Sequence, residues 1–265
     1  AATLDELQER IGAVDAAVMA QAAEGACVVS LMHANNETGV LQPVAALAKA
    51  LAGRGVLVHT DAVQSVGKVP VDVKTLGVDL LSLSGHKLNA PKGVGALWLK
   101  KGTRLSPVIT GHQEKNRRGG TENVASIVAF GLACELAAKE LAAHAAAALK
   151  FRERIEAGAL AVPGARLNGS AARLPNTSHL SFDGVDGHQL VIALDLEGVC
   201  VSSGPACSSG ASLPSHVLTA MGVEPGRAAS SIRVSTGWGT TAADVDKFLA
   251  VLPKAVERLR QVVTA

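Results

Sequence analysis

A lysine and an aspartate each follow an apolar segment that is typical of a buried strand. Lys87 lies in SLSGHKLNAPKGVG at 82–95, just after the apolar run 78–83, and Asp61 ends the run 55–60. A lysine amine binds pyridoxal phosphate (PLP) through an imine, and a carboxylate keeps a proton on the pyridine nitrogen. Delivered from neighbouring strand ends, the two side chains predict a PLP site.

Polar residues next to these two positions suit the same cofactor. Gln64 could donate to the phenolic oxygen of the ring, and Ser84 and His86 offer donors to a phosphate. Glycines around Lys87 allow the backbone to approach a ligand closely. An aspartate that caps a helix and a lysine on the solvated surface would show the same local patterns, so each residue alone is weak evidence.

Cys207 lies in a loop of small residues, SSGPACSSG at 202–210. The thiolate is the nucleophilic form of cysteine, and an exposed loop thiol suits attack better than a buried one. An incidental loop cysteine is the alternative. We expect Cys27, Cys134 and Cys200 to be core residues. The four cysteines show no CxxC spacing, so we predict neither a zinc site nor any other metal.

The elements that must position these residues alternate between strands and helices. Apolar strands are predicted at 27–32, 55–60, 78–83 and 94–99, with a helix at 43–53. The pattern predicts an α/β fold with a mostly parallel sheet flanked by helices. Ligands of such sheets collect at the carboxyl ends of the strands. We also predict a helix that starts near Thr3, from the spacing of its apolar residues.

The second half of the chain has a different pattern. An alanine-rich helical stretch covers about 122–155 and is followed by predicted strands at 176–182 and 199–202. A final helix covers about 241–262, where Pro253 should kink or interrupt it. We therefore predict a large domain at 1–143 and a smaller C-terminal α+β domain at 144–265 that carries the cysteine loop.

Composition excludes several other classes of function. The 265 residues carry a net charge of +2, from 25 basic and 23 acidic side chains, and only 2% are aromatic. These values give no basis for binding nucleic acid or an anionic membrane. With no long apolar run and no leader sequence, we expect a cytoplasmic protein.

Six segments, in order, resemble one family. They are HANNETG at 33–39, HTDAVQSVGK at 59–68, SGHKLNAPKGVGAL at 84–97, RRGGTEN at 117–123, SSGPACSSGASLPSHVL at 202–218 and SSIRVSTG at 230–237. Together they resemble the cysteine desulfurases of the class-V PLP-dependent aminotransferase family, in the branch of nitrogen fixation and iron–sulfur cluster assembly. The resemblance implies the fold of PLP-dependent transferases, fold-type I.

For the cofactor, the resemblance implies that Lys87 binds PLP covalently and later carries the substrate's α-proton. Asp61 would pair with the pyridinium nitrogen and Gln64 with the phenolic oxygen. The phosphate would be bound by Ser84 and His86, joined by Thr121 from the partner subunit of a homodimer.

For the substrate, the resemblance implies that L-cysteine is converted to L-alanine. Arg233 would bind the substrate carboxylate with its planar fork. Asn36 would help hold both cofactor and carboxylate. Cys207 would attack the sulfur, becoming a persulfide that passes to a sulfur-acceptor or iron–sulfur scaffold protein.

The family's N-terminal region has no counterpart here, since the resemblance begins near Thr3. We expect the N-terminal strands of the sheet to be missing, and this chain alone to bind PLP weakly and desulfurate poorly. A selenocysteine lyase, another class-V lyase, or a truncated non-catalytic binding protein remain the alternatives.

Overall fold

The computed structural model describes residues 12–170, 172–204 and 215–263. The chain forms two compact units. The N-terminal unit comprises residues 15–34 and 42–142. The C-terminal unit comprises the described residues of 143–263 together with 35–41 and 12–14. The short segment 35–41 therefore groups with a part of the chain that lies far away in sequence.

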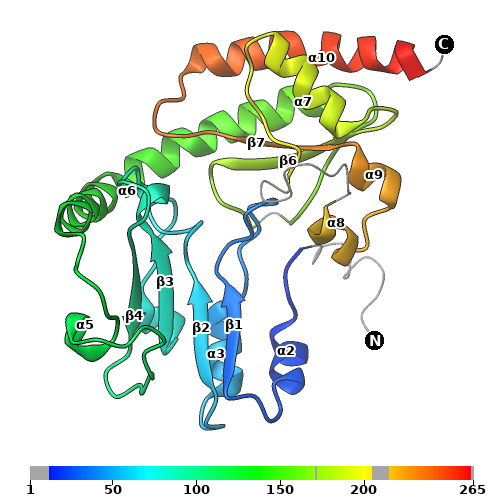
Figure 1. Cartoon of the computed structure of the whole chain (residues 1–265). Coiled ribbons are helices and arrows are strands. Elements are labelled where there is room, and N and C mark those ends of the chain that lie inside the picture. The colour runs from blue at the N-terminus through cyan, green and yellow to red at the C-terminus, as the bar shows by residue number, and fades with distance from the viewer. Residues whose placement is uncertain (1–11, 171, 205–214, 264–265) are drawn as a thin grey trace. The chain divides into compact units, whose positions relative to one another are not determined.

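The N-terminal unit is built on a four-stranded sheet in the order β1 (Val28–Met32), β2 (Leu57–Asp61), β3 (Leu80–Ser84) and β4 (Gly95–Leu99) (Figure 1). The first three strands are parallel and β4 is antiparallel to β3. In the register, Asp61 lies opposite both Met32 and Ser82. The mostly parallel sheet predicted from the sequence is thus present, and its carboxyl ends lie side by side.

Four helices and one 3-10 turn lie wholly within the described part of this unit. They are α2 (Ala16–Ala22), α3 (Val44–Leu51), α4 (Val73–Leu76) and α5 (Gln113–Asn116), with the 3-10 turn η1 (Gly85–Leu88) after β3. In α3 the buried residues Val44, Leu47, Ala48 and Leu51 have the spacing of one helical face. They share a core with strand residues such as Val29 and Val58. Burial of this face holds the helix against the sheet.

The C-terminal unit has a three-stranded antiparallel sheet of β5 (Ala165–Leu167), β6 (Thr177–Phe182) and β7 (Ser231–Ser235). Its helices are α7 (Gly187–Leu196), α8 (His216–Ala220), α9 (Pro225–Ala229) and α10 (Ala242–Val263). All six residues of β6 are buried. The long helix α6 (Val124–Leu160) contributes residues to both units.

The predicted strand at 199–202 was wrong: the segment forms no strand, and only Ser202 bridges to Arg233 of β7. Helix α10 is not interrupted at Pro253, which was one of the two outcomes predicted there. A proline ring removes one backbone hydrogen bond, and the buried α10 residues Phe248, Leu252 and Val256 supply packing that offsets this loss.

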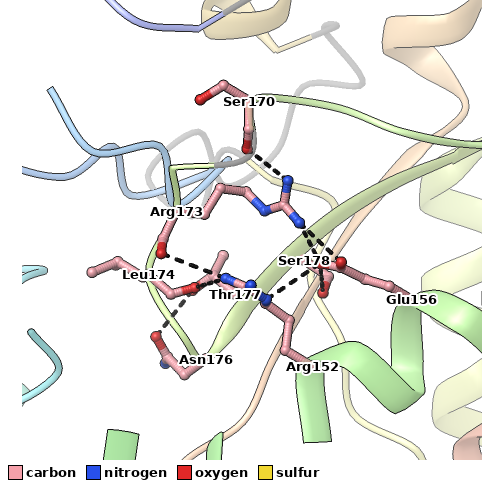
Figure 2. A network of polar contacts seen from close by, with 8 residues as sticks. All are labelled: Arg152, Glu156, Ser170, Arg173, Leu174, Asn176, Thr177 and Ser178. Carbon is pink, nitrogen blue, oxygen red and sulfur yellow. Dashed lines mark hydrogen bonds and ion pairs between the residues drawn. The ribbon is translucent and has the colours of Figure 1, made fainter. Parts of the chain in front are cut away.

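A polar network joins α6 to the segment that leads into β6 (Figure 2). Arg173 donates to both carboxylate oxygens of Glu156 at 2.9 Å, and the Ser178 hydroxyl donates to the same carboxylate at 2.8 Å. Arg152 donates to the backbone carbonyl of Leu174 at 2.7 Å. The Glu156 carboxylate therefore balances part of the charge of two arginines within the unit.

The cysteines differ from expectation. Cys27 and Cys200 are exposed and Cys134 is half-buried, so the prediction of three core cysteines was wrong. The Cys200 thiol lies 3.7 Å from the Asp195 carboxylate. Within the described ranges, no helix is long and apolar enough to cross a membrane.

Candidate active site

The carboxyl ends of β2 and β3 bring the predicted acid and amine to one edge of the N-terminal unit. Asp61 is the last residue of β2, and the next amide, of Ala62, donates to the Ser82 carbonyl of β3 at 2.9 Å. Strand β3 ends at Ser84, and η1 follows directly with Lys87 on it. Both Asp61 and Lys87 are exposed in this chain. The two chemical groups thus follow adjacent parallel strands, as the sequence predicted.

Ser84 and His86 form a pair next to the lysine. The Ser84 hydroxyl lies 2.7 Å from Nδ1 of His86. Between them, Gly85 donates its amide to the Val94 carbonyl at 2.9 Å, and a Cβ at Gly85 would lie 2.8 Å from the Val94 side chain. A hydroxyl, an imidazole and a turn of backbone are therefore held beside Lys87 by a glycine that cannot be enlarged.

Gln64 lies in the turn that follows Asp61. The Asp61 carboxylate accepts from the Val63 amide at 2.8 Å, which fixes the start of this turn. The amide oxygen of Gln64 accepts from Lys68 at 3.2 Å. This contact uses the accepting end of the Gln64 amide, and its NH2 group is the end that can donate to a phenolic oxygen.

Below this turn, the buried His33 ring lies 2.9 Å from the Ser65 hydroxyl, through its Nδ1. Burial lowers the pKa of His33. The Ser65 contact gives this histidine a structural role. His33 therefore supports the loop that carries Gln64.

In the C-terminal unit, Asn36 and Arg233 contact each other. The Asn35 side chain accepts from the amides of Glu37 and Thr38, both at 2.9 Å, and so shapes the turn around Asn36. Arg233, on β7, donates from Nη1 to the Asn36 backbone carbonyl at 2.7 Å. Two residues predicted from separate motifs to bind a substrate carboxylate are thus hydrogen-bonded neighbours.

Other predicted site residues are not part of these two groups. Thr121 is exposed in the N-terminal unit, just before α6. Cys207 lies outside the described residues. Among the residues that the structure describes, no group of three or more His, Cys, Asp or Glu side chains could hold a metal ion.

Sequence reasoning gave no role to Glu37, which is only 1% exposed. Its carboxylate accepts a 2.5 Å hydrogen bond from Ser215, which is also buried. The signal that could have found it is an acidic residue between amides and small residues in HANNETG. Its partner could not be found from the sequence, because Ser215 lies far away in the chain.

The donor set of the N-terminal unit fits PLP. It offers an amine from Lys87, a carboxylate from Asp61, and a hydroxyl and an imidazole from Ser84 and His86 for the phosphate. Each of these residues lies at the carboxyl end of β2 or β3 or directly after it. Ligands of open α/β sheets bind at this edge.

Comparisons with known proteins find cysteine desulfurases among the relatives of this chain. A cysteine desulfurase of Cereibacter sphaeroides is 51% identical over 236 residues, which is 88% of this chain and 60% of that protein. Cysteine desulfurase NifS of Azotobacter vinelandii is 44% identical over 238 residues, or 89% of this chain and 59% of its own length. The chain therefore spans about three fifths of the length of these relatives.

Solved structures give the same result. A NifS-like protein superposes with a TM-score of 0.86 at 35% identity, over 94% of this chain and 67% of its own. The NifS-like protein of Rickettsia africae gives a TM-score of 0.85 at 33% identity, over 94% and 68% of the two chains. These likenesses confirm the predicted fold of PLP-dependent transferases. The sequence profile described as aminotransferase class-V matches residues 8–248, and the chain belongs to that family.

Proposed function

We propose that the protein to which this chain belongs is a PLP-dependent cysteine desulfurase that converts L-cysteine to L-alanine. The observation that carries the proposal is the placement of Lys87 and Asp61 after adjacent parallel strands, with Ser84 and His86 beside the lysine. Because the chain covers only about 60% of its relatives, the activity is proposed for the whole protein.

In this proposal the N-terminal unit holds the cofactor. Lys87 binds PLP covalently, Asp61 holds a proton on the pyridine nitrogen, Gln64 donates to the phenolic oxygen, and Ser84 and His86 bind the phosphate. PLP, when bound, withdraws electrons from the α-carbon of an amino acid. Lys87 would also serve as the general base that takes the proton from the α-carbon of the substrate.

The C-terminal unit would recognise the substrate. Arg233 binds the carboxylate through its guanidinium fork, and the hydrogen bond to the Asn36 carbonyl sets the orientation of that fork. Asn36 offers its side-chain amide to cofactor and carboxylate. A lysine in place of Arg233 would supply the charge without the two parallel donors.

Cys207 would perform the sulfur transfer. Its thiolate attacks the substrate sulfur, an S–S bond forms, and the C–S bond breaks with its electron pair left on the β-carbon. That carbon takes a proton, which gives alanine, and the enzyme keeps the sulfur as a persulfide. The reaction balances without an external oxidant or reductant.

The persulfide would pass to a sulfur-acceptor or iron–sulfur scaffold protein in the cytoplasm. We also propose a homodimer, in which Thr121 of one subunit contributes to the phosphate site of the other. Exposed apolar residues on the first half of α6 support a subunit interface near Thr121. They are Val124, Ile127, Val128, Leu132 and Leu136.

The test is to incubate the purified chain with excess PLP, reduce with borohydride, and map the labelled lysine by mass spectrometry. Reduction traps even a weakly populated imine. We expect the label on Lys87, its loss in Lys87→Ala, and its retention in Lys92→Ala, which removes another exposed lysine of the same loop. A label spread over surface lysines, with Lys87 not preferred, would contradict the proposal.

A further inference from the structure

Glu37 is a buried carboxylate with an unusually short hydrogen bond. It is 1% exposed, and the Ser215 hydroxyl donates to its Oε2 at 2.5 Å. A buried polar group needs a hydrogen-bond partner, because burial removes the water that would otherwise supply one. The contact with Ser215 meets that need for Glu37 and therefore favours keeping the two side chains together.

Ser215 marks the downstream end of the segment that contains Cys207. It begins α8 as its N-cap, since its hydroxyl oxygen accepts from the Leu218 amide at 3.1 Å. One side chain therefore has two partners, the α8 backbone and Glu37. The position of α8's first turn is set by the Glu37 carboxylate.

The upstream end of the same segment is held by Arg233 of β7 and passes close to Glu37. Ser202 exchanges two backbone hydrogen bonds with Arg233, at 3.1 and 2.6 Å. Two residues later, Gly204 is buried with φ +98°, and a Cβ there would lie 3.2 Å from Oε2 of Glu37. The backbone thus passes over the same carboxylate oxygen that accepts from Ser215.

Glu37 also follows Asn36 directly in the chain, and the Asn36 carbonyl accepts from Arg233. The Glu37 side chain therefore lies close to three parts of the chain. They are the upstream end of the Cys207 segment, its downstream end, and the loop that carries the proposed substrate-binding residue.

We propose that Glu37 is a positioning residue for sulfur transfer: its carboxylate holds Ser215, the first described residue after the segment that carries Cys207, beside the Asn36 loop. The inference rests on the proposed desulfurase function. Glu37 contacts neither PLP nor the reacting sulfur in this proposal, and it acts through its hydrogen bond from Ser215. Its loss should leave cofactor binding intact and slow the step that requires the Cys207 thiol.

The experiment compares Glu37→Ala, Glu37→Gln and a matched control, Glu156→Gln. Glu156 is likewise a largely buried carboxylate of the C-terminal unit that accepts from a serine, but its partners are Ser178 and Arg173. Alanine formation from L-cysteine gives kcat and KM. Hydrogen exchange of peptides covering 200–218, with a β6 peptide as reference, reports the segment without any cofactor.

For Glu37→Ala we expect kcat to fall about 100-fold, as when a reacting group is displaced by about 1 Å, with KM changed less than about twofold. Exchange in 200–218 should be about tenfold faster, because a hydrogen bond to a charged group is lost. Glu37→Gln should recover most of both properties, since its amide oxygen still accepts from Ser215. Borohydride labelling of Lys87 should be unchanged in both.

The two hypotheses fail differently. Absence of Lys87 labelling in the wild-type chain refutes the proposed role of Lys87 in binding PLP, and the exchange comparison still tests the Glu37 contact. A wild-type chain that forms alanine, together with a Glu37→Ala variant of equal kcat, refutes the positioning role. So does a Glu156→Gln variant with the same loss of kcat and the same faster exchange in 200–218.

Discussion

His179 makes the stability of the C-terminal unit depend on pH. The ring lies on β6 with no exposed surface, and its Nδ1 is 3.1 Å from the side-chain amide of Asn168. Burial, and then the positive charges of Arg233 and Arg227, lower the pKa of His179 to about 4. The folded chain therefore keeps this ring neutral where the unfolded chain, with an ordinary pKa of 6.5, begins to protonate it.

The sign of the effect follows from this difference. Between pH 6.5 and about 4 the unfolded state binds more protons than the folded state, so stability falls as the pH falls. For these two pKa values, the loss between about pH 7.5 and about pH 4.5 is roughly 2.5 kcal/mol of unfolding free energy. Above the pKa of the unfolded state the contribution is fully present.

Carboxylates titrate in the same range, so the assay needs a variant that lacks only this ring. We expect the wild type to lose about 2.5 kcal/mol more than His179→Gln between the two pH values, in urea unfolding followed by circular dichroism. Nuclear magnetic resonance of the His179 ring in the wild type should show it neutral down to about pH 4.5. Equal losses in wild type and variant, or a ring that titrates near pH 6.5, would refute the reasoning.

Two further predictions concern the C-terminal unit. Glu156→Ala should lower the free energy of unfolding, measured in urea, by about 3–5 kcal/mol, because Arg173, whose side chain is 5% exposed, loses its carboxylate partner. Glu156→Gln should lower this free energy clearly less. Equal losses of unfolding free energy in the two variants would contradict the charge argument. Gly187→Ala should lower the melting temperature, because a Cβ at this position would lie 2.4 Å from the Ser231 carbonyl oxygen. Gly237→Ala should leave the melting temperature unchanged, because there is open space around Gly237. A similar melting temperature for both variants would show that the close contact relaxes without cost.

Much of the candidate site could be predicted because it is encoded locally. Apolar runs of strand length ending in Asp61 and just before Ser84 specify parallel strands, and residues that follow adjacent parallel strands meet at one edge of the sheet. Lys87 and His86 lie within a few residues of that edge. No distant contact was needed to place them, so the cofactor side of the site followed from strand pattern and motif.

Burial and isolated contacts could not be predicted in the same way. Cys200 lies in a short apolar segment and is nonetheless exposed. The segment forms no strand, and its residue Ser202 makes one isolated bridge to Arg233. Whether a short apolar segment enters a sheet depends on the strands available to pair with it. Those strands are far away in sequence, so local propensity does not decide the outcome.

The sequence by itself determined the sheet, the family resemblance, and the residues that we propose to hold PLP. Only the tertiary structure decided which distant residues meet. It grouped 35–41 with the C-terminal unit, joined Asn36 to Arg233, and buried Glu37 against Ser215. The physical reason is that a hydrogen bond depends on the positions of two groups in space, and for residues far apart in sequence the fold of the whole chain decides that distance.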